Sequence, residues 1–149
     1  MKIQSSIKMA DISDKLQTKR VAVAQAKVFM KKDTLKRLIQ GKIPKGDVLA
    51  CARIAGITAA KKTSGLIPLC HPLEITDVKV DFNLDEKKGF ILVNSTVSVL
   101  GRTGVEMEAL TAASIASLTI YDMCKPVDRD IVISDIMLLE KKRRKEWCL

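Results

Sequence analysis

The sequence is poor in the residues that metal sites and nucleic-acid platforms need. It contains one histidine, four cysteines and only 3% aromatic residues. Because the cysteines show no CxxC spacing, a zinc site would have to gather them from scattered positions. We therefore expect reduced thiols and no metal site. The few aromatic residues also disfavour the stacking platforms that hold single-stranded nucleic acid.

Long apolar runs are absent as well. No segment approaches the roughly 20 apolar residues that cross a bilayer, and residues 1–5 begin no apolar run of signal-peptide length. The composition, 47% hydrophobic and 29% charged residues, is typical of a globular protein. We expect one cytoplasmic domain over residues 1–149, with an N-terminal arm at 1–15 and a basic tail at 142–149.

The charge is strongly one-sided. A formal net charge of +9 indicates an anionic partner, which could be nucleic acid, a membrane surface or a phosphorylated small molecule. The densest basic run, KKRRK at 141–145, is of a kind that most often forms a solvated tail. The remaining excess is spread along the chain, which leaves a folded basic pocket open.

Hydrophobic periodicity predicts an α+β domain. Strands are expected at 20–30, 78–82, 91–99 and 131–139, and helices at 33–39, 48–62 and 103–124. Asp33 and Asp47 are candidate caps for the first two helices, and Thr103 with Glu106 fits a capping box for the third. Gly56 inside the second helix indicates a close helix contact. The order β-α-α-β-β-α-β predicts a ferredoxin-like antiparallel sheet packed by helices, with an extra helix in the first crossover.

The only histidine follows a cysteine in the segment Leu69-Cys70-His71-Pro72. Histidine titrates near neutrality, and the flanking prolines exclude this segment from a helix. Two interpretations stay open at this point, an active-site loop and an ordinary surface loop.

The long third helix carries charged residues at its two ends. Glu106 and Glu108 stand at its start, whereas Asp122 and Lys125 stand at its end. The helix dipole alone could explain the carboxylates at the start, and an ordinary ion pair could explain the end. Glu106 and Asp122 lie about 16 residues apart, or roughly 24 Å along a helix. If all four act in one site, different subunits must supply the two ends.

Lys45 precedes a predicted helix N-terminus, where backbone N–H groups and a lysine favour a phosphate, although an ordinary loop lysine would look the same. The GxxxxGK[ST] pattern of a phosphate-binding loop is absent, so nothing indicates an ATPase. A serine triad is also unsupported, because no nucleophile elbow surrounds any serine.

Several longer motifs carry a family resemblance. They are KGDV at 45–48, ARIAGI at 52–57, IPLCHPL at 67–73, TGVEMEALTA at 103–112 and YDMCK at 121–125. Together they resemble the MoaC family of cyclic pyranopterin monophosphate synthases over about residues 9–141. The resemblance implies a homohexamer, a trimer of dimers, with active sites between subunits. It also implies a lyase reaction of molybdenum cofactor biosynthesis, in which 3′,8-cyclo-7,8-dihydroguanosine 5′-triphosphate becomes cyclic pyranopterin monophosphate and diphosphate.

The resemblance also implies the site residues. Catalysis falls on Asp122 and Lys125, which we expect to act as a coupled acid and base. Of the substrate-binding positions, Lys45 and Lys141 are expected to hold the triphosphate. The others are expected to position the guanine-derived ring and the ribose; they are Leu69, Cys70, His71, Glu106, Met107 and Glu108. No cofactor is required. Mg²⁺ could assist, although no carboxylate cluster specifies it.

One departure from the family follows Lys141. The family usually continues with a glycine-rich, lysine-containing loop, whereas this chain reads KRRKEWCL at 142–149, which makes a closing loop doubtful. The alternative function is a non-catalytic basic module that binds nucleic acid through residues 141–145. That alternative leaves Glu106, Glu108 and Asp122 unexplained.

Overall fold

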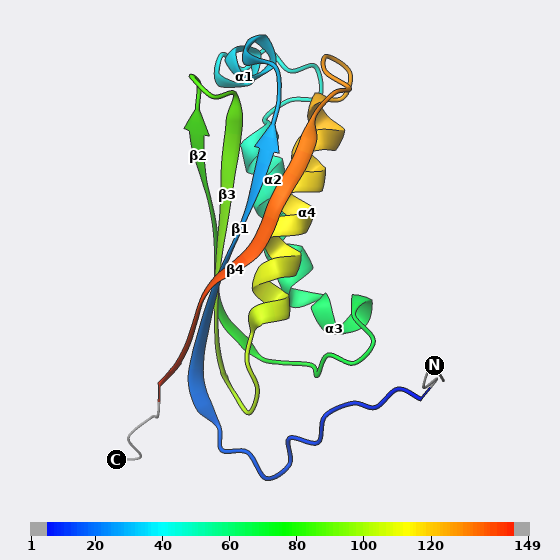
Figure 1. The fold of residues 1–149 in the computed structure, drawn as a ribbon, viewed down its shortest axis with the longest axis vertical. Helices are drawn as coiled ribbons and strands as arrows, with labels where there is room; N and C mark the ends of the chain where they lie inside the picture. Colours follow the sequence, from blue (N-terminus) through cyan, green and yellow to red (C-terminus); the bar gives the residue numbers. More distant parts are fainter. Residues whose placement is uncertain (1–5, 145–149) are drawn as a thin grey trace, which may run out of the picture.

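The computed structural model describes residues 6–144 and contains one four-stranded sheet with helices packed on one face (Figure 1). The strand order is β2-β3-β1-β4, and every neighbouring pair is antiparallel. The elements are β1 (Thr18–Phe29), α1 (Lys32–Ile39), α2 (Val48–Lys61), α3 (Thr63–Leu66), β2 (Ile75–Asp85), β3 (Phe90–Gly101), α4 (Glu106–Cys124) and β4 (Val132–Arg144). The predicted ferredoxin-like α+β fold is confirmed. The first crossover holds α1, α2 and also the single-turn α3, which was not predicted.

Small side chains allow the helices to lie close to the sheet. The helix-facing positions of β1 are Ala22, Ala24 and Ala26, each at most 1% exposed, and the facing side of α4 is also rich in alanine. A Cβ atom on Gly56 of α2 would lie 3.1 Å from the carbonyl oxygen of Ala112 in α4. The close helix contact predicted at Gly56 is therefore confirmed.

The helix starts agree only in part with prediction. Asp47 caps α2, because its side chain accepts a hydrogen bond from the N–H of Ala50 at 3.1 Å. The other two predicted caps are wrong. Asp33 lies within the first turn of α1, whose N-cap is Lys31, and α4 begins after Val105 with no side-chain cap rather than at Thr103.

The last strand is longer than the pattern 131–139 indicated. Residues 142–144, expected in a basic tail, continue β4 along β1, where Lys141 lies opposite Ala22 and Arg143 opposite Arg20. Basic side chains are common on an edge strand, because they oppose pairing with another chain. Residues 1–5 and 145–149 lie outside the described residues. Within 6–144, none of the helices has the length and apolarity to cross a membrane.

Candidate active site

The predicted site residues form two groups at opposite ends of α4, which runs along the long axis of the molecule (Figure 1). The first group, here the Asp122 cluster, consists of Lys45, Asp122 and Lys125. The second group, here the His71 cluster, consists of Leu69, Cys70, His71, Glu106, Met107, Glu108 and Lys141. Within one subunit, Lys45 and Lys141, both expected to hold the triphosphate, therefore lie near opposite ends of α4.

In the Asp122 cluster, two lysines hold one carboxylate. Lys125 Nζ lies 2.9 Å from Oδ1 of Asp122, and Lys45 Nζ lies 3.2 Å from its Oδ2. Lys45 Nζ also donates to the main-chain oxygen of Asp122 at 3.0 Å. Hydrogen bonds from Lys125 and then Lys45 keep the pKa of Asp122 below its ordinary value. The cluster is an ionised carboxylate between two cations at a solvent-exposed position.

Local backbone conformation explains how Lys45 reaches Asp122. Gly46 has a φ of 110°, a backbone angle that residues other than glycine rarely adopt. Its N–H donates to the carbonyl oxygen of Ile43 at 3.1 Å, which closes a tight turn. Ile43 is buried in the core and anchors this turn. Lys45 is therefore presented from an anchored turn beside the end of α4.

All members of the His71 cluster except Lys141 line a cavity of about 190 Å³ at the start of α4. Six predicted substrate-binding residues line it, together with Ala10 from the N-terminal arm and two loop residues; the six are Leu69, Cys70, His71, Glu106, Met107 and Glu108. A second, smaller cavity of about 80 Å³ also borders His71 and Glu108. The structure thus brings together two segments that lie far apart in the sequence.

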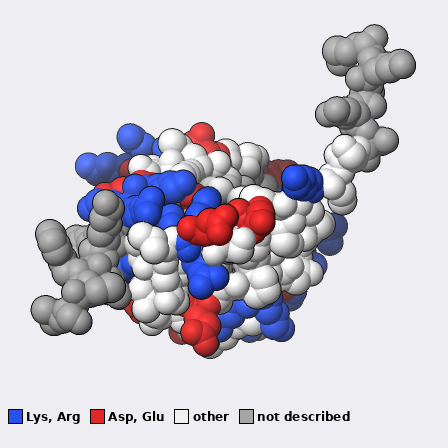
Figure 2. Space-filling view, turned by 90° about the horizontal axis from the view of Figure 1, so that it is seen from below, with Lys and Arg blue, Asp and Glu red and all other residues white. Residues whose placement is uncertain are grey.

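Glu106 forms an ion pair with Lys141 of β4. Burial raises the pKa of Glu106, but Lys141 and Arg20 outweigh burial and keep this pKa below its ordinary value. Arg20 is 8% exposed, and its Nε donates to the carbonyl oxygen of Gly101 at 3.2 Å. Viewed from this end, basic side chains lie beside a smaller acidic group (Figure 2).

Sequence reasoning missed Arg20, although a signal was present. Arg20 shares the helix-facing side of β1 with Ala22, Ala24 and Ala26, and an arginine on such a face is unusual without a polar partner. Burial and the neighbouring Arg143 lower the pKa of Arg20, and Glu106 opposes that shift. An arginine thus stands beside the Glu106–Lys141 pair.

Glu108 is the most deeply buried carboxyl group of the cluster. It is 5% exposed, and among the described residues its Oε2 has no hydrogen-bond partner. Burial raises the pKa of Glu108, and the neighbouring Glu106 adds to the effect. Burial, and then the charge of Glu108, likewise raises the pKa of Cys70. Cys70 is therefore a protonated thiol near neutral pH and a poor nucleophile.

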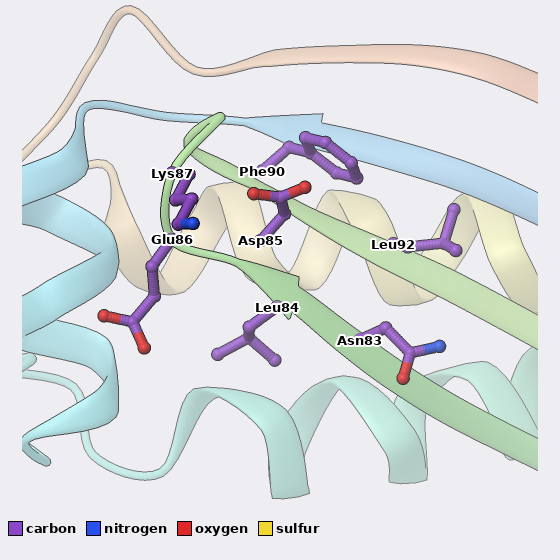
Figure 3. Close-up of a pocket in the computed structure, with 7 residues that line it drawn as sticks. All are labelled: Asn83, Leu84, Asp85, Glu86, Lys87, Phe90 and Leu92. Atoms are coloured by element: carbon purple, nitrogen blue, oxygen red, sulfur yellow. The ribbon is translucent and has the colours of Figure 1, made fainter.

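A separate hollow of about 390 Å³ lies at the turn between β2 and β3 (Figure 3). Its side chains spread away from one another rather than converging on one point, and none of them is a predicted site residue. Within residues 6–144, no group of three His, Cys, Asp or Glu side chains could hold a metal ion. The residues of the sequence motifs gather instead in the two clusters at the ends of α4, which are therefore the candidate site.

Comparison with known proteins agrees with the motifs. Residues 9–143 match the MoaC family. A cyclic pyranopterin monophosphate synthase of Thermoanaerobacter pseudethanolicus is 56% identical over 134 residues, covering 90% of this chain and 85% of that protein. Proteins of the same name from Heliobacterium modesticaldum and Syntrophomonas wolfei are 58% identical (90% of this chain, 84% of that protein) and 52% identical (93% and 88%). The chain therefore belongs to the MoaC family.

Proposed function

We propose that this protein is a cyclic pyranopterin monophosphate synthase, a lyase of molybdenum cofactor biosynthesis. It converts 3′,8-cyclo-7,8-dihydroguanosine 5′-triphosphate to cyclic pyranopterin monophosphate and diphosphate. The observation that carries the proposal is the cavity at the start of α4, on which six motif residues converge. Membership of the MoaC family and relatives of that name at 52–58% identity support it.

The complete site joins two subunits in this proposal. The two clusters lie at opposite ends of a 19-residue helix, which is roughly 28 Å long at about 1.5 Å per residue. The cavity of about 190 Å³ is also smaller than the roughly 300–1,000 Å³ usual for small-molecule sites. We therefore propose a homohexamer, a trimer of dimers, in which the His71 cluster of one chain meets the Asp122 cluster of its neighbour. Light scattering of the purified protein tests this assembly.

Phosphate chemistry falls to the lysines. A ribose hydroxyl attacks the α-phosphorus, diphosphate leaves, and negative charge builds on the phosphate oxygens. Lys45 and Lys141, supplied by neighbouring chains, bind the triphosphate and stabilise this charge. The Asp122 carboxylate and the Lys125 ammonium, 2.9 Å apart, accept and donate protons during ring opening and pterin formation.

Recognition of the ring falls to the His71 cluster. The Glu108 Oε2 lacks a partner among the described residues, so a polar atom of the guanine-derived ring would satisfy it. Leu69 and Met107 are partly exposed and offer apolar contact beside it. Cys70, as a protonated thiol, contacts the substrate rather than attacking it.

No cofactor is required in this proposal, and any Mg²⁺ assists by accompanying the triphosphate. Turnover with and without a chelator measures that contribution. We also propose a cytoplasmic location, where nucleotide-derived substrates are formed.

The direct test is incubation of the purified chain with the cyclic dihydroguanosine triphosphate, following diphosphate and pterin. We expect turnover by the unmodified chain, loss of turnover in Lys125→Ala, and no change in Lys87→Ala, a control at an exposed lysine of the β2–β3 turn. Normal turnover by folded Lys125→Ala would refute the acid–base role. An inactive, folded wild-type chain with salt-sensitive nucleic-acid affinity would favour the basic binding module instead.

A further inference from the structure

Asp128 is a buried carboxylate in the turn that follows α4. It is 2% exposed, and its oxygens accept three hydrogen bonds, from the N–H of Lys31 at 3.0 Å, the hydroxyl of Thr34 at 2.9 Å and the N–H of Asp130 at 3.0 Å. Burial raises the pKa of Asp128, but these hydrogen bonds together keep it below its ordinary value. Asp128 is therefore held ionised in the interior by the start of α1.

Asp128 supplies the cap that α1 lacks locally. The N-cap residue of α1 is Lys31, which has no side-chain oxygen to cap the first turn. The carboxylate of Asp128 accepts at this position instead, although it lies 97 residues further along the chain. A negative charge is also favoured at a helix N-terminus. This long-range cap ties α1 to the end of α4.

The turn that contains Asp128 also carries the catalytic lysine. The N–H groups of Val127 and Asp128 both donate to the carbonyl oxygen of Cys124 at 3.0 Å, which folds the chain tightly around Lys125. Residues 31–45, here the α1 segment, run from the Asp128 contact through α1 to the turn that carries Lys45. At that turn, Lys45 donates a hydrogen bond to the carboxylate of Asp122. The segment thus meets the end of α4 at two points.

The two contacts between this segment and the end of α4 differ in how firmly they hold the structure. The side chains of Lys45 and Asp122 are 38% and 56% exposed, and exposed ion pairs hold structure only weakly. At the other point, Asp128 and Thr34 are each 2% exposed, so water does not compete for their hydrogen bond. The buried contact is therefore the one able to set the spacing between the segment and α4.

We infer that Asp128 is a positioning residue, which fixes the start of α1 against the turn after α4 and so places Lys45 beside Asp122 and Lys125. The role in turnover rests on the proposed function, whereas the mechanical role does not. Substrate contact is not needed for either role, because Asp128 is enclosed by protein.

The test uses matched variants at the contact. Asp128→Asn keeps the shape but removes the negative charge that faces the start of α1. In either orientation its amide N–H₂ also faces a main-chain N–H that itself donates, so at least one of the three hydrogen bonds is lost. Thr34→Val removes the hydroxyl that donates to Asp128, whereas Thr34→Ser keeps it. The control is Asp130→Asn, a carboxylate of the same turn whose side chain is 83% exposed. Within the described part of the chain, its only ion pair is with the exposed Nζ of Lys31 at 3.6 Å, and such an exposed pair holds structure only weakly.

Amide hydrogen exchange is the first measurement, because it requires no activity. The N–H of Gly46 closes the turn that carries Lys45. We expect this amide to exchange about 10-fold faster in Asp128→Asn and Thr34→Val, and at the wild-type rate in Thr34→Ser and the control, while amides in the middle of α4 stay unchanged. Unchanged exchange at Gly46 in Asp128→Asn would overturn the inference.

Turnover is the second measurement. We expect Asp128→Asn to lower kcat/KM about 10-fold in the wild-type background, since small misplacements of catalytic groups have effects of this order. In a Lys45→Met background the same change should cost less than about twofold, because the group it positions is gone. Equal losses in both backgrounds would overturn the inference in favour of a merely structural role. An inactive wild-type chain would refute the proposed function, and exchange at Gly46 would then decide the positioning role alone.

Discussion

Replacing Lys45 with methionine separates binding from stability. The change removes a cation from the Asp122 cluster and keeps an unbranched side chain. Because Lys45 and Asp122 are 38% and 56% exposed, their ion pair contributes only about 0–1 kcal/mol to folding. Asp122 also keeps Lys125 at 2.9 Å. We expect the free energy of unfolding to change by less than about 1 kcal/mol.

The effect on catalysis should be larger. A hydrogen bond to a charged group is worth about 1.5–3 kcal/mol when its partner is otherwise unsatisfied. At about 1.4 kcal/mol for each factor of ten, loss of the contact between Lys45 and a phosphate raises KM by roughly 10- to 100-fold. We expect kcat to fall less, since Asp122 and Lys125 remain in place.

The assay combines diphosphate release at varied substrate concentration with urea unfolding of the same preparations. Lys42→Met is the matched control, because Lys42 is an exposed lysine of the same loop and makes no ion pair with any residue in 6–144. An unchanged KM in folded Lys45→Met would refute the phosphate-binding role. A loss of stability well above about 1 kcal/mol would refute the reasoning that the pair is weak.

Two further predictions concern stability. In Gly65→Ala the new Cβ has free space, so we expect helix propensity to raise the free energy of unfolding by about 0.5–1 kcal/mol. Gly56→Ala should be about 1–3 kcal/mol less stable than Gly65→Ala, because its Cβ would lie only 3.1 Å from the Ala112 carbonyl oxygen. Equal stability of the two variants in urea unfolding would contradict the close approach. The pKa of Asp128 lies below its ordinary value, so its carboxylate stabilises fully above about pH 5 and loses that contribution as the pH falls through the folded-state pKa. The stability advantage of wild type over Asp128→Asn should therefore shrink from pH 7 to pH 2, and a pH-independent difference would contradict it.

Local periodicity was sufficient to predict most elements. Apolar and polar residues alternate in β2 and β3 because one face of each strand packs against the helices. The register between the two strands follows from keeping that face apolar. The last four residues of β4 could not be predicted this way, because residues 141–144 are all basic. Their strand conformation comes from pairing with β1, an interaction between distant parts of the chain.

The prediction of helix caps from local sequence failed at α1 and at α4. At Asp47 the side chain caps its own helix, so the local pattern was sufficient. At α1 the cap comes from Asp128, and no local pattern reveals it. At α4 the N-cap residue is Val105, which lies two residues after Thr103 and caps nothing with its apolar side chain, so Thr103 and Glu106 do not stand at the positions of a capping box.

The candidate site was predicted better by motif than by spacing. Helix length correctly separated Glu106 from Asp122, and the motifs indicated the residues that line the cavity at the start of α4. The pairing of Lys141 with Glu106 depends on the register of β4 on β1, which the sequence does not display. Arg20 was detectable only by asking which side of its strand it occupies.

The shared active site is tested most directly by complementation between two inactive variants. Asp122→Asn disables one end of α4 and Glu106→Gln disables the other, and the two chains are unfolded, mixed in equal amounts and refolded together. If each site joins ends from different subunits, about a quarter of the sites regain both intact ends by random assembly, and turnover returns to about a quarter of the wild-type rate. A mixture as inactive as either variant alone, at wild-type oligomer size, would contradict the shared site.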